Sequence, residues 1–104
     1  VYVVHAHQIK AKRVDSIVCL SVNDAFVMGA WGEAQNAEQI IMLADGNAEL
    51  TQALGLVLDG SSFGMGTRSQ RYSMLVNDGT VEALNVEPAG GIDVSSAEAM
   101  LALL

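Results

Sequence analysis

The chain is poor in charged and aromatic residues, and it has a single cysteine and a single proline. Only 16% of its 104 residues are charged, whereas 51% are hydrophobic. A complete soluble domain usually carries about 25% charged residues. The shortfall predicts a piece of a larger domain, or a domain that buries one face against a partner.

Basic residues are the scarcer of the two charged kinds. Five lysines and arginines stand against twelve aspartates and glutamates, which gives a formal net charge of −7. A surface of this sign repels phosphate backbones. We therefore expect no binding to nucleic acid.

The lone cysteine, Cys19, excludes a disulfide within the chain and favours a reducing compartment. We therefore predict a cytoplasmic protein, although the first residue is Val1 rather than methionine, which leaves organelle targeting open. No apolar run approaches the roughly 18 residues that a membrane helix needs, so no membrane span is expected.

The stretch from Ile17 to Trp31 predicts a strand, a turn and a helix. Ile17 to Val22 is apolar and mostly branched, which is typical of a strand buried in a parallel sheet. Asn23 and Asp24 are natural helix-capping residues, and the apolar segment after them begins a helix. In such sheets, sites lie at the carboxyl ends of the strands, which here means near Ser21 to Asp24.

The remaining elements follow from periodicity, caps and turn residues. The predicted helices are Val1–Lys12, a helix after Asp24 that ends at Trp31–Gly32 or about Ala37, Ala48–Leu54 with Asn47 as cap, and Ser95–Leu104 with a Ser95/Glu98 capping box. The predicted extended segments are Ile40–Ala44, Leu56–Leu58 and a hairpin over Gln70–Val86 that turns at Asp78-Gly79 and ends at Pro88, Gly90 and Gly91. Residues 59–66 are predicted as a glycine-and-serine loop.

This order of elements predicts an α/β fold of the thioredoxin-like type. A central mixed sheet would be flanked by helices on both sides, and the first strands of that arrangement would be missing. No internal repeat or linker interrupts the chain. We therefore predict one partial domain over residues 1–104.

Two motifs suggest a cofactor at first sight, but their spacing argues against one. His5 and His7 are two residues apart on a predicted helix, so their side chains point to nearly opposite sides rather than to one metal ion. Gly64 and Gly66 form only the start of a dinucleotide-binding pattern, and a strand follows them instead of a helix. No metal and no cofactor are expected.

Three segments carry a family resemblance. CLSVNDAFVMGAW at 19–31, TRSQRYSMLVNDG at 67–79 and ALNVEP at 83–88 resemble, in order, the atypical peroxiredoxins of the redoxin-domain type. Members of that family reduce hydrogen peroxide and alkyl hydroperoxides through a cysteine sulfenic acid, with glutaredoxin and glutathione or thioredoxin as reductant. The resemblance implies that the peroxide-attacking cysteine motif would lie before Val1, so the chain as given would be inactive alone.

The resemblance also implies a role for Arg71, which stands in the family's R-(F/Y)-S segment as QRYS. A thiol has a pKa of about 8.5, so a nearby positive charge must favour the thiolate. A guanidinium can do this and can also donate to the peroxide as negative charge moves onto the leaving oxygen. From the residues alone, a solvated arginine on a strand face remains the alternative.

Other residues receive weaker assignments. Arg68, with Phe63, Met65 and Thr67, could wall a peroxide pocket. Cys19 lies in the middle of a predicted strand, where burial would raise its pKa, so we interpret it as a structural thiol. A redox sensor based on Cys19 is the alternative.

A different class of function also stays open. The chain could be a non-catalytic thioredoxin-like module that dimerises or docks through Phe26, Met28 and Trp31. For the peroxidase, the family implies a homodimer. It also implies an external thiol that resolves the oxidised sulfur, because Val94 stands about where some members carry a resolving cysteine.

Overall fold

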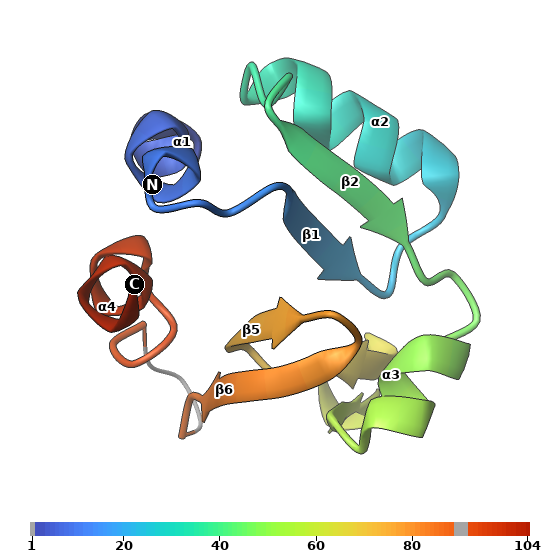
Figure 1. The fold of residues 1–104 in the computed structure, drawn as a ribbon. Helices are drawn as coiled ribbons and strands as arrows, with labels where there is room; N and C mark the ends of the chain where they lie inside the picture. The colour runs from blue at the N-terminus through green and yellow to red at the C-terminus, as the bar shows by residue number, and fades with distance from the viewer. Residues whose placement is uncertain (1, 89–91) are drawn as a thin grey trace.

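The computed structural model describes residues 2–88 and 92–104, which combine α-helices with two-stranded ladders (Figure 1). The elements are α1 Tyr2–Ala11, β1 Ile17–Ser21, α2 Ala25–Ala34, β2 Ile40–Ala44, α3 Glu49–Leu54, β3 Val57–Gly60, the 3₁₀ turn η1 Ser61–Phe63, β4 Gly66–Ser69, β5 Tyr72–Asn77, β6 Thr80–Val86 and α4 Ala97–Leu103. Val1 and the predicted strand end at Gly90 and Gly91 lie outside the described residues.

The first strand, turn and helix form as predicted. β1 pairs in parallel with β2, from Ile17 opposite Ile40 to Ser21 opposite Ala44. The α2 helix begins after Asp24, whose carboxylate accepts a hydrogen bond of 2.8 Å from the Val27 N–H. This bond satisfies one of the free amides of the first turn. α2 then packs against β2 (Figure 1).

The predicted hairpin is also confirmed. β5 and β6 are antiparallel, and Asp78 and Gly79 connect them with φ angles of 52° and 78°. Two successive residues with positive φ make a turn whose twist matches that of the strands, and Asp-Gly is a favoured pair for it. The hairpin brings the start of β5 opposite the end of β6, where Tyr72 faces Val86.

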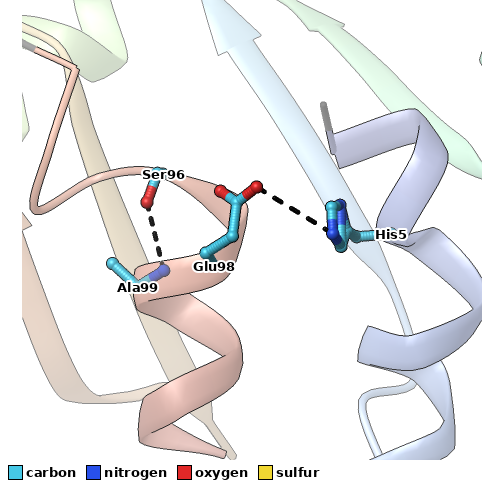
Figure 2. A network of polar contacts seen from close by, with 4 residues as sticks. All are labelled: His5, Ser96, Glu98 and Ala99. Atoms are coloured by element: carbon cyan, nitrogen blue, oxygen red, sulfur yellow. Dashed lines mark hydrogen bonds and ion pairs between the residues drawn. The ribbon is translucent and has the colours of Figure 1, made fainter.

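The helices at the two ends of the chain lie side by side (Figure 1). Figure 2 shows the contact between His5 on α1 and Glu98 on α4, whose nearest N and O atoms are 3.9 Å apart. Ser96 caps α4, because its hydroxyl accepts a hydrogen bond of 3.1 Å from the Ala99 N–H (Figure 2). The predicted cap at Ser95 is therefore wrong, and the Ser95 side chain is engaged elsewhere.

Two predictions near the middle of the chain need correction. Asn47 does not cap α3: the helix begins after Ala48, and Asp45 instead accepts from the N–H groups of Leu50 and Thr51 at 3.2 and 2.8 Å. The loop predicted over 59–66 is shorter in the structure, because its ends belong to β3 and β4, which pair as a hairpin around residues 61–65. Its glycines allow this close approach, since a Cβ on Gly60 would lie 3.1 Å from a backbone oxygen.

The strands do not form one continuous sheet among the described residues. They form three two-stranded ladders: β1 with β2, β3 with β4, and β5 with β6. Parallel and antiparallel pairing are thus both present, but no ladder joins β1 to the β5–β6 hairpin, so the prediction of a single central sheet is not met. Side chains connect these parts instead, as in the bond of 2.8 Å from Arg68 Nη1 to the Val22 carbonyl.

The core of the described residues is small. The buried apolar residues are Ala6, Ile9, Val22, Met28, Ala37, Ala48, Leu56, Ala97 and Met100. Large apolar side chains such as Val18 and Ile41, which face each other across β1 and β2, are more than half exposed. Within 2–88 and 92–104, every helix is too short to cross a membrane.

Candidate active site

Arg71 stands at the open end of the β5–β6 hairpin. Its carbonyl accepts a hydrogen bond of 2.9 Å from the Glu87 N–H, so these two residues face each other just beyond the ladder. Pairing of the two strands therefore fixes the backbone from which both side chains project.

The guanidinium of Arg71 reaches toward the two terminal helices. Its Nε donates to the Ser95 hydroxyl at 3.0 Å, and the hydroxyl of Tyr2 donates to the Ser95 carbonyl at 2.8 Å. Burial raises the pKa of Tyr2, while the Ser73 hydroxyl and the charge of Arg71 act in the opposite direction. Arg71 thus lies beside the amino end of α1.

The buried carboxylate of Glu87 binds Ser95, the residue that accepts from Arg71. Glu87 Oε2 accepts from the Ser95 hydroxyl at 2.6 Å, from the Asp93 N–H at 2.6 Å and from the Ser95 N–H at 2.7 Å. The Ser95 hydroxyl, followed by the backbone N–H groups, lowers the pKa of Glu87 to about 2. The carboxylate is consequently ionised at neutral pH and can act only as an acceptor.

Arg68 occupies a separate place, at the carboxyl ends of β1 and β2. Its Nη1 donates to the Val22 carbonyl and to Asn23 Oδ1 at 2.8 and 3.1 Å, and its Nε donates to the Met65 carbonyl at 2.9 Å. It borders an open hollow of about 480 Å³. The other lining residues are Val22, Asn23, Asp24, Val27, Gly46, Asn47, Met65 and Thr67.

Three of the four predicted pocket residues therefore lie together, and one does not. Met65, Thr67 and Arg68 line the hollow, whereas Phe63 projects from η1 with 81% of its surface exposed. Phe63 lies in the η1 turn between β3 and β4, so it is not part of this hollow. Arg71 is not among the residues of this hollow.

Cys19 lies on β1 as a half-buried free thiol. Burial raises its pKa, and the charge of Arg71 offsets this only in part. A raised pKa leaves little thiolate at neutral pH. This environment favours the interpretation of Cys19 as a structural thiol.

Two of the three predicted interface residues are exposed, and the third is buried. Phe26 and Trp31 on α2 are 89% and 44% exposed, as a contact surface requires. Met28 is 1% exposed, and its sulfur lies 3.9 Å from the Asn23 side-chain amide. Met28 faces inward because it is on the side of α2 that packs against the strands, so its assignment to an exposed interface is wrong.

The described residues contain no group of three or more histidine, cysteine or acidic side chains that could hold a metal ion. His7 pairs with Gln39 at 3.1 Å, and His5 contacts Glu98. The two histidines thus have different neighbours: Gln39 in the turn before β2, and Glu98 on α4.

Comparison with known families identifies the chain. Residues 1–101 match the family model described as Redoxin. The chain belongs to the redoxin family. The resemblance to atypical peroxiredoxins on the motifs at 19–31, 67–79 and 83–88 is thereby confirmed.

Curated relatives of this redoxin chain are peroxiredoxins. It is 48% identical to a chloroplastic peroxiredoxin-2E-2 of rice over 107 residues, which is 99% of the chain and 48% of the relative. It is 45% identical to a peroxiredoxin of Synechocystis over 104 residues, 93% of the chain and 55% of that relative. The chain thus spans about half the length of these relatives.

Solved structures show the same fold. The redoxin chain is 60% identical to reduced Prx3 from Vibrio vulnificus, solved in complex with hydrogen peroxide, with a TM-score of 0.95 over 99% of this chain and 67% of that one. It is 36% identical to peroxiredoxin 5 from Alvinella pompejana, with a TM-score of 0.86 over 97% of this chain and 63% of that one. The predicted thioredoxin-like α/β fold is therefore confirmed.

Sequence reasoning missed Glu87, Ser95 and Tyr2 as parts of this site. Glu87 was within reach, because it belongs to the ALNVEP motif that carries the resemblance. Ser95 was assigned to a capping box, which concealed its contact with Arg71. The bond from Tyr2 to Ser95 joins residues 93 positions apart, and no local pattern indicates such a contact.

Proposed function

We propose that this redoxin chain works as part of a thiol-dependent peroxidase that reduces hydrogen peroxide and alkyl hydroperoxides. The observation that carries the proposal is the position of Arg71, held beside the amino end of α1 by Ser95. Membership of the redoxin family and the likeness to a peroxiredoxin solved with hydrogen peroxide support it.

The reaction needs a cysteine thiolate, for which Cys19 is poorly suited because burial raises its pKa. We propose that the nucleophile comes from a segment preceding Val1. Its sulfur attacks one peroxide oxygen, the O–O bond breaks, and the leaving oxygen takes a proton to become water or an alcohol. Arg71 would favour the thiolate and stabilise the negative charge on the leaving oxygen.

The cysteine is left as a sulfenic acid. Two equivalents of an external thiol would reduce it, releasing water and forming a disulfide between the reductant thiols. We propose glutathione with glutaredoxin, or thioredoxin, as the source of these thiols, because the one cysteine of this chain is half-buried Cys19. A cytoplasmic homodimer is the setting we expect for it.

The test uses the product of the complete open reading frame that contains this chain. Peroxide consumption is followed with glutathione and glutaredoxin, and separately with thioredoxin. Replacing Arg71 with alanine should lower kcat/KM about a hundredfold, since it removes a charged donor from the reacting oxygen. Arg13→Ala is the matched control. It removes an exposed arginine from the connection between α1 and β1 and should leave kcat/KM unchanged.

Turnover of R71A within about twofold of the wild type would contradict the role of Arg71. A wild-type protein that consumes no peroxide with either reductant would contradict the peroxidase itself. It would favour the second candidate, a docking module, for which the exposure of Phe26 and Trp31 on α2 is the supporting observation.

A further inference from the structure

The buried carboxylate of Glu87 takes no part in the reaction as described so far. Its residue is 7% exposed, and Oε2 accepts three hydrogen bonds while the other oxygen, Oε1, has no partner among the described residues. A buried charge with an unpaired oxygen is costly. The cost of burying the Glu87 carboxylate suggests that its negative charge has a role at the proposed site.

The hydrogen-bond directions supply an answer. A serine hydroxyl has one proton to give and lone pairs with which to accept. Because the Glu87 carboxylate can only accept, the proton of the Ser95 hydroxyl must point toward Glu87 Oε2, 2.6 Å away. The lone pairs of the same oxygen are then left for Arg71 Nε, 3.0 Å away.

The charge therefore turns Ser95 into a fixed acceptor. Fastening Arg71 through Nε leaves its two terminal nitrogens without an acceptor among residues 2–88 and 92–104. Those nitrogens carry four of the five N–H groups of the guanidinium. The guanidinium is thus held through Nε, and its two terminal nitrogens are available to a ligand.

We infer that Glu87 and Ser95 are positioning residues, which fix the guanidinium of Arg71 so that its terminal nitrogens meet the sulfur anion and the peroxide. This inference rests on the proposed peroxidase function. It adds a carboxylate and a hydroxyl that touch neither substrate nor nucleophile and act only through Arg71.

The test compares variants of the product of the complete open reading frame. Ser95→Ala removes the acceptor for Arg71 and should lower kcat/KM about tenfold, the scale of one hydrogen bond to a charged group. Ser95→Thr keeps a hydroxyl and should restore most of the rate. Glu87→Gln keeps the shape but replaces a charge-assisted bond with a neutral one, so a loss of about threefold is expected.

The pH dependence separates positioning from simple electrostatics. If Glu87 acted only through its negative charge, E87Q would favour the thiolate and move the half-maximal rate to lower pH. If Glu87 positions Arg71, the guanidinium of E87Q stabilises the thiolate less, and the half-maximal rate moves to higher pH. We expect the upward shift in E87Q and in S95A, and a downward shift in E87Q would overturn the inference.

A control variant and an NMR measurement distinguish loss of Arg71 positioning from general loss of stability. Ser96→Ala removes the cap of α4 at the residue after Ser95 (Figure 2). It should lower the urea midpoint of unfolding, while kcat/KM stays within twofold. In protein labelled with ¹⁵N-arginine, the Nε–H signal of Arg71 should exchange slowly in wild type and S95T and rapidly in S95A.

The outcomes are distinguishable. A wild type without turnover overturns the proposed function and this inference together. An active wild type with S95A at the same rate and the same pH profile overturns the inference alone, as does a slowly exchanging Arg71 signal in S95A.

Discussion

Ser95 and Ser96 are adjacent, yet their hydroxyls contact different parts of the molecule. Ser95 donates to the carboxylate of Glu87, whereas Ser96 accepts from the Ala99 N–H and begins α4. Ser95 links the side chains of Glu87 and Arg71, and Ser96 caps the helix. The short connection into α4 therefore serves the candidate site and the fold with two consecutive residues.

At the same scale, Glu87 should make stability depend on pH in the acid range. Its pKa is about 2 in the folded chain, below its ordinary value of 4.5. The stabilisation is complete above pH 4.5, where both states are ionised, and is lost as the pH falls through 2. Urea unfolding from pH 6 to pH 2 should show this decline in the wild type and a weaker decline in E87Q.

E38Q is the matched control for that series, because it removes an exposed carboxylate. It should decline as steeply as the wild type. Equal slopes for E87Q and the wild type would show that Glu87 does not carry this pH dependence.

At the scale of elements, the local signals were sufficient where a cap or a turn is encoded by neighbouring residues. Asp24 caps α2 and Asp78-Gly79 turns the hairpin, both as predicted. Local signals failed where a distant partner decides. Ser95 carries a capping pattern, but its hydroxyl donates to Glu87 instead. The ends of the predicted loop over 59–66 pair as parts of β3 and β4, because Gly60 lets the two backbones approach closely.

The cap on α2 gives a direct test at this scale. Asp24→Ala should lower the free energy of unfolding by about 1 kcal/mol, because the Val27 N–H loses its acceptor. Chemical denaturation measures this change. E38A, which also removes one carboxylate, should change the free energy of unfolding by less than about 0.5 kcal/mol. A D24A protein as stable as E38A would mean that the cap contributes nothing.

At the scale of the whole molecule, large exposed apolar side chains outnumber buried apolar residues within 2–88 and 92–104. The exposed large apolar residues include Val18 and Ile41 on the strands and Phe26 and Trp31 on α2. Large exposed apolar areas mark interaction sites on many proteins. The low content of charge in the sequence agrees with this distribution, since few residues are available to make the surface polar.

The dimer prediction can be tested on this surface. Phe26→Glu should weaken self-association at least tenfold, because Phe26 is 89% exposed and a charge in an apolar contact is costly. Sedimentation equilibrium measures the effect. Phe63→Glu is the matched control, since Phe63 is 81% exposed on η1 and should leave the association constant unchanged. Equal effects of the two variants would show that α2 is not part of the dimer interface.

The side-by-side packing of α1 and α4 has a mechanical consequence. Tyr2 and Ser95 are hydrogen-bonded although they are 93 residues apart, and α1 and α4 are the first and last helices of the described residues (Figure 1). A force that pulls α1 away from α4 would load the contacts between these two helices. The first link to the candidate site that such a pull reaches is the bond between Tyr2 and Ser95, so tension on the termini would act on the residue that holds Arg71.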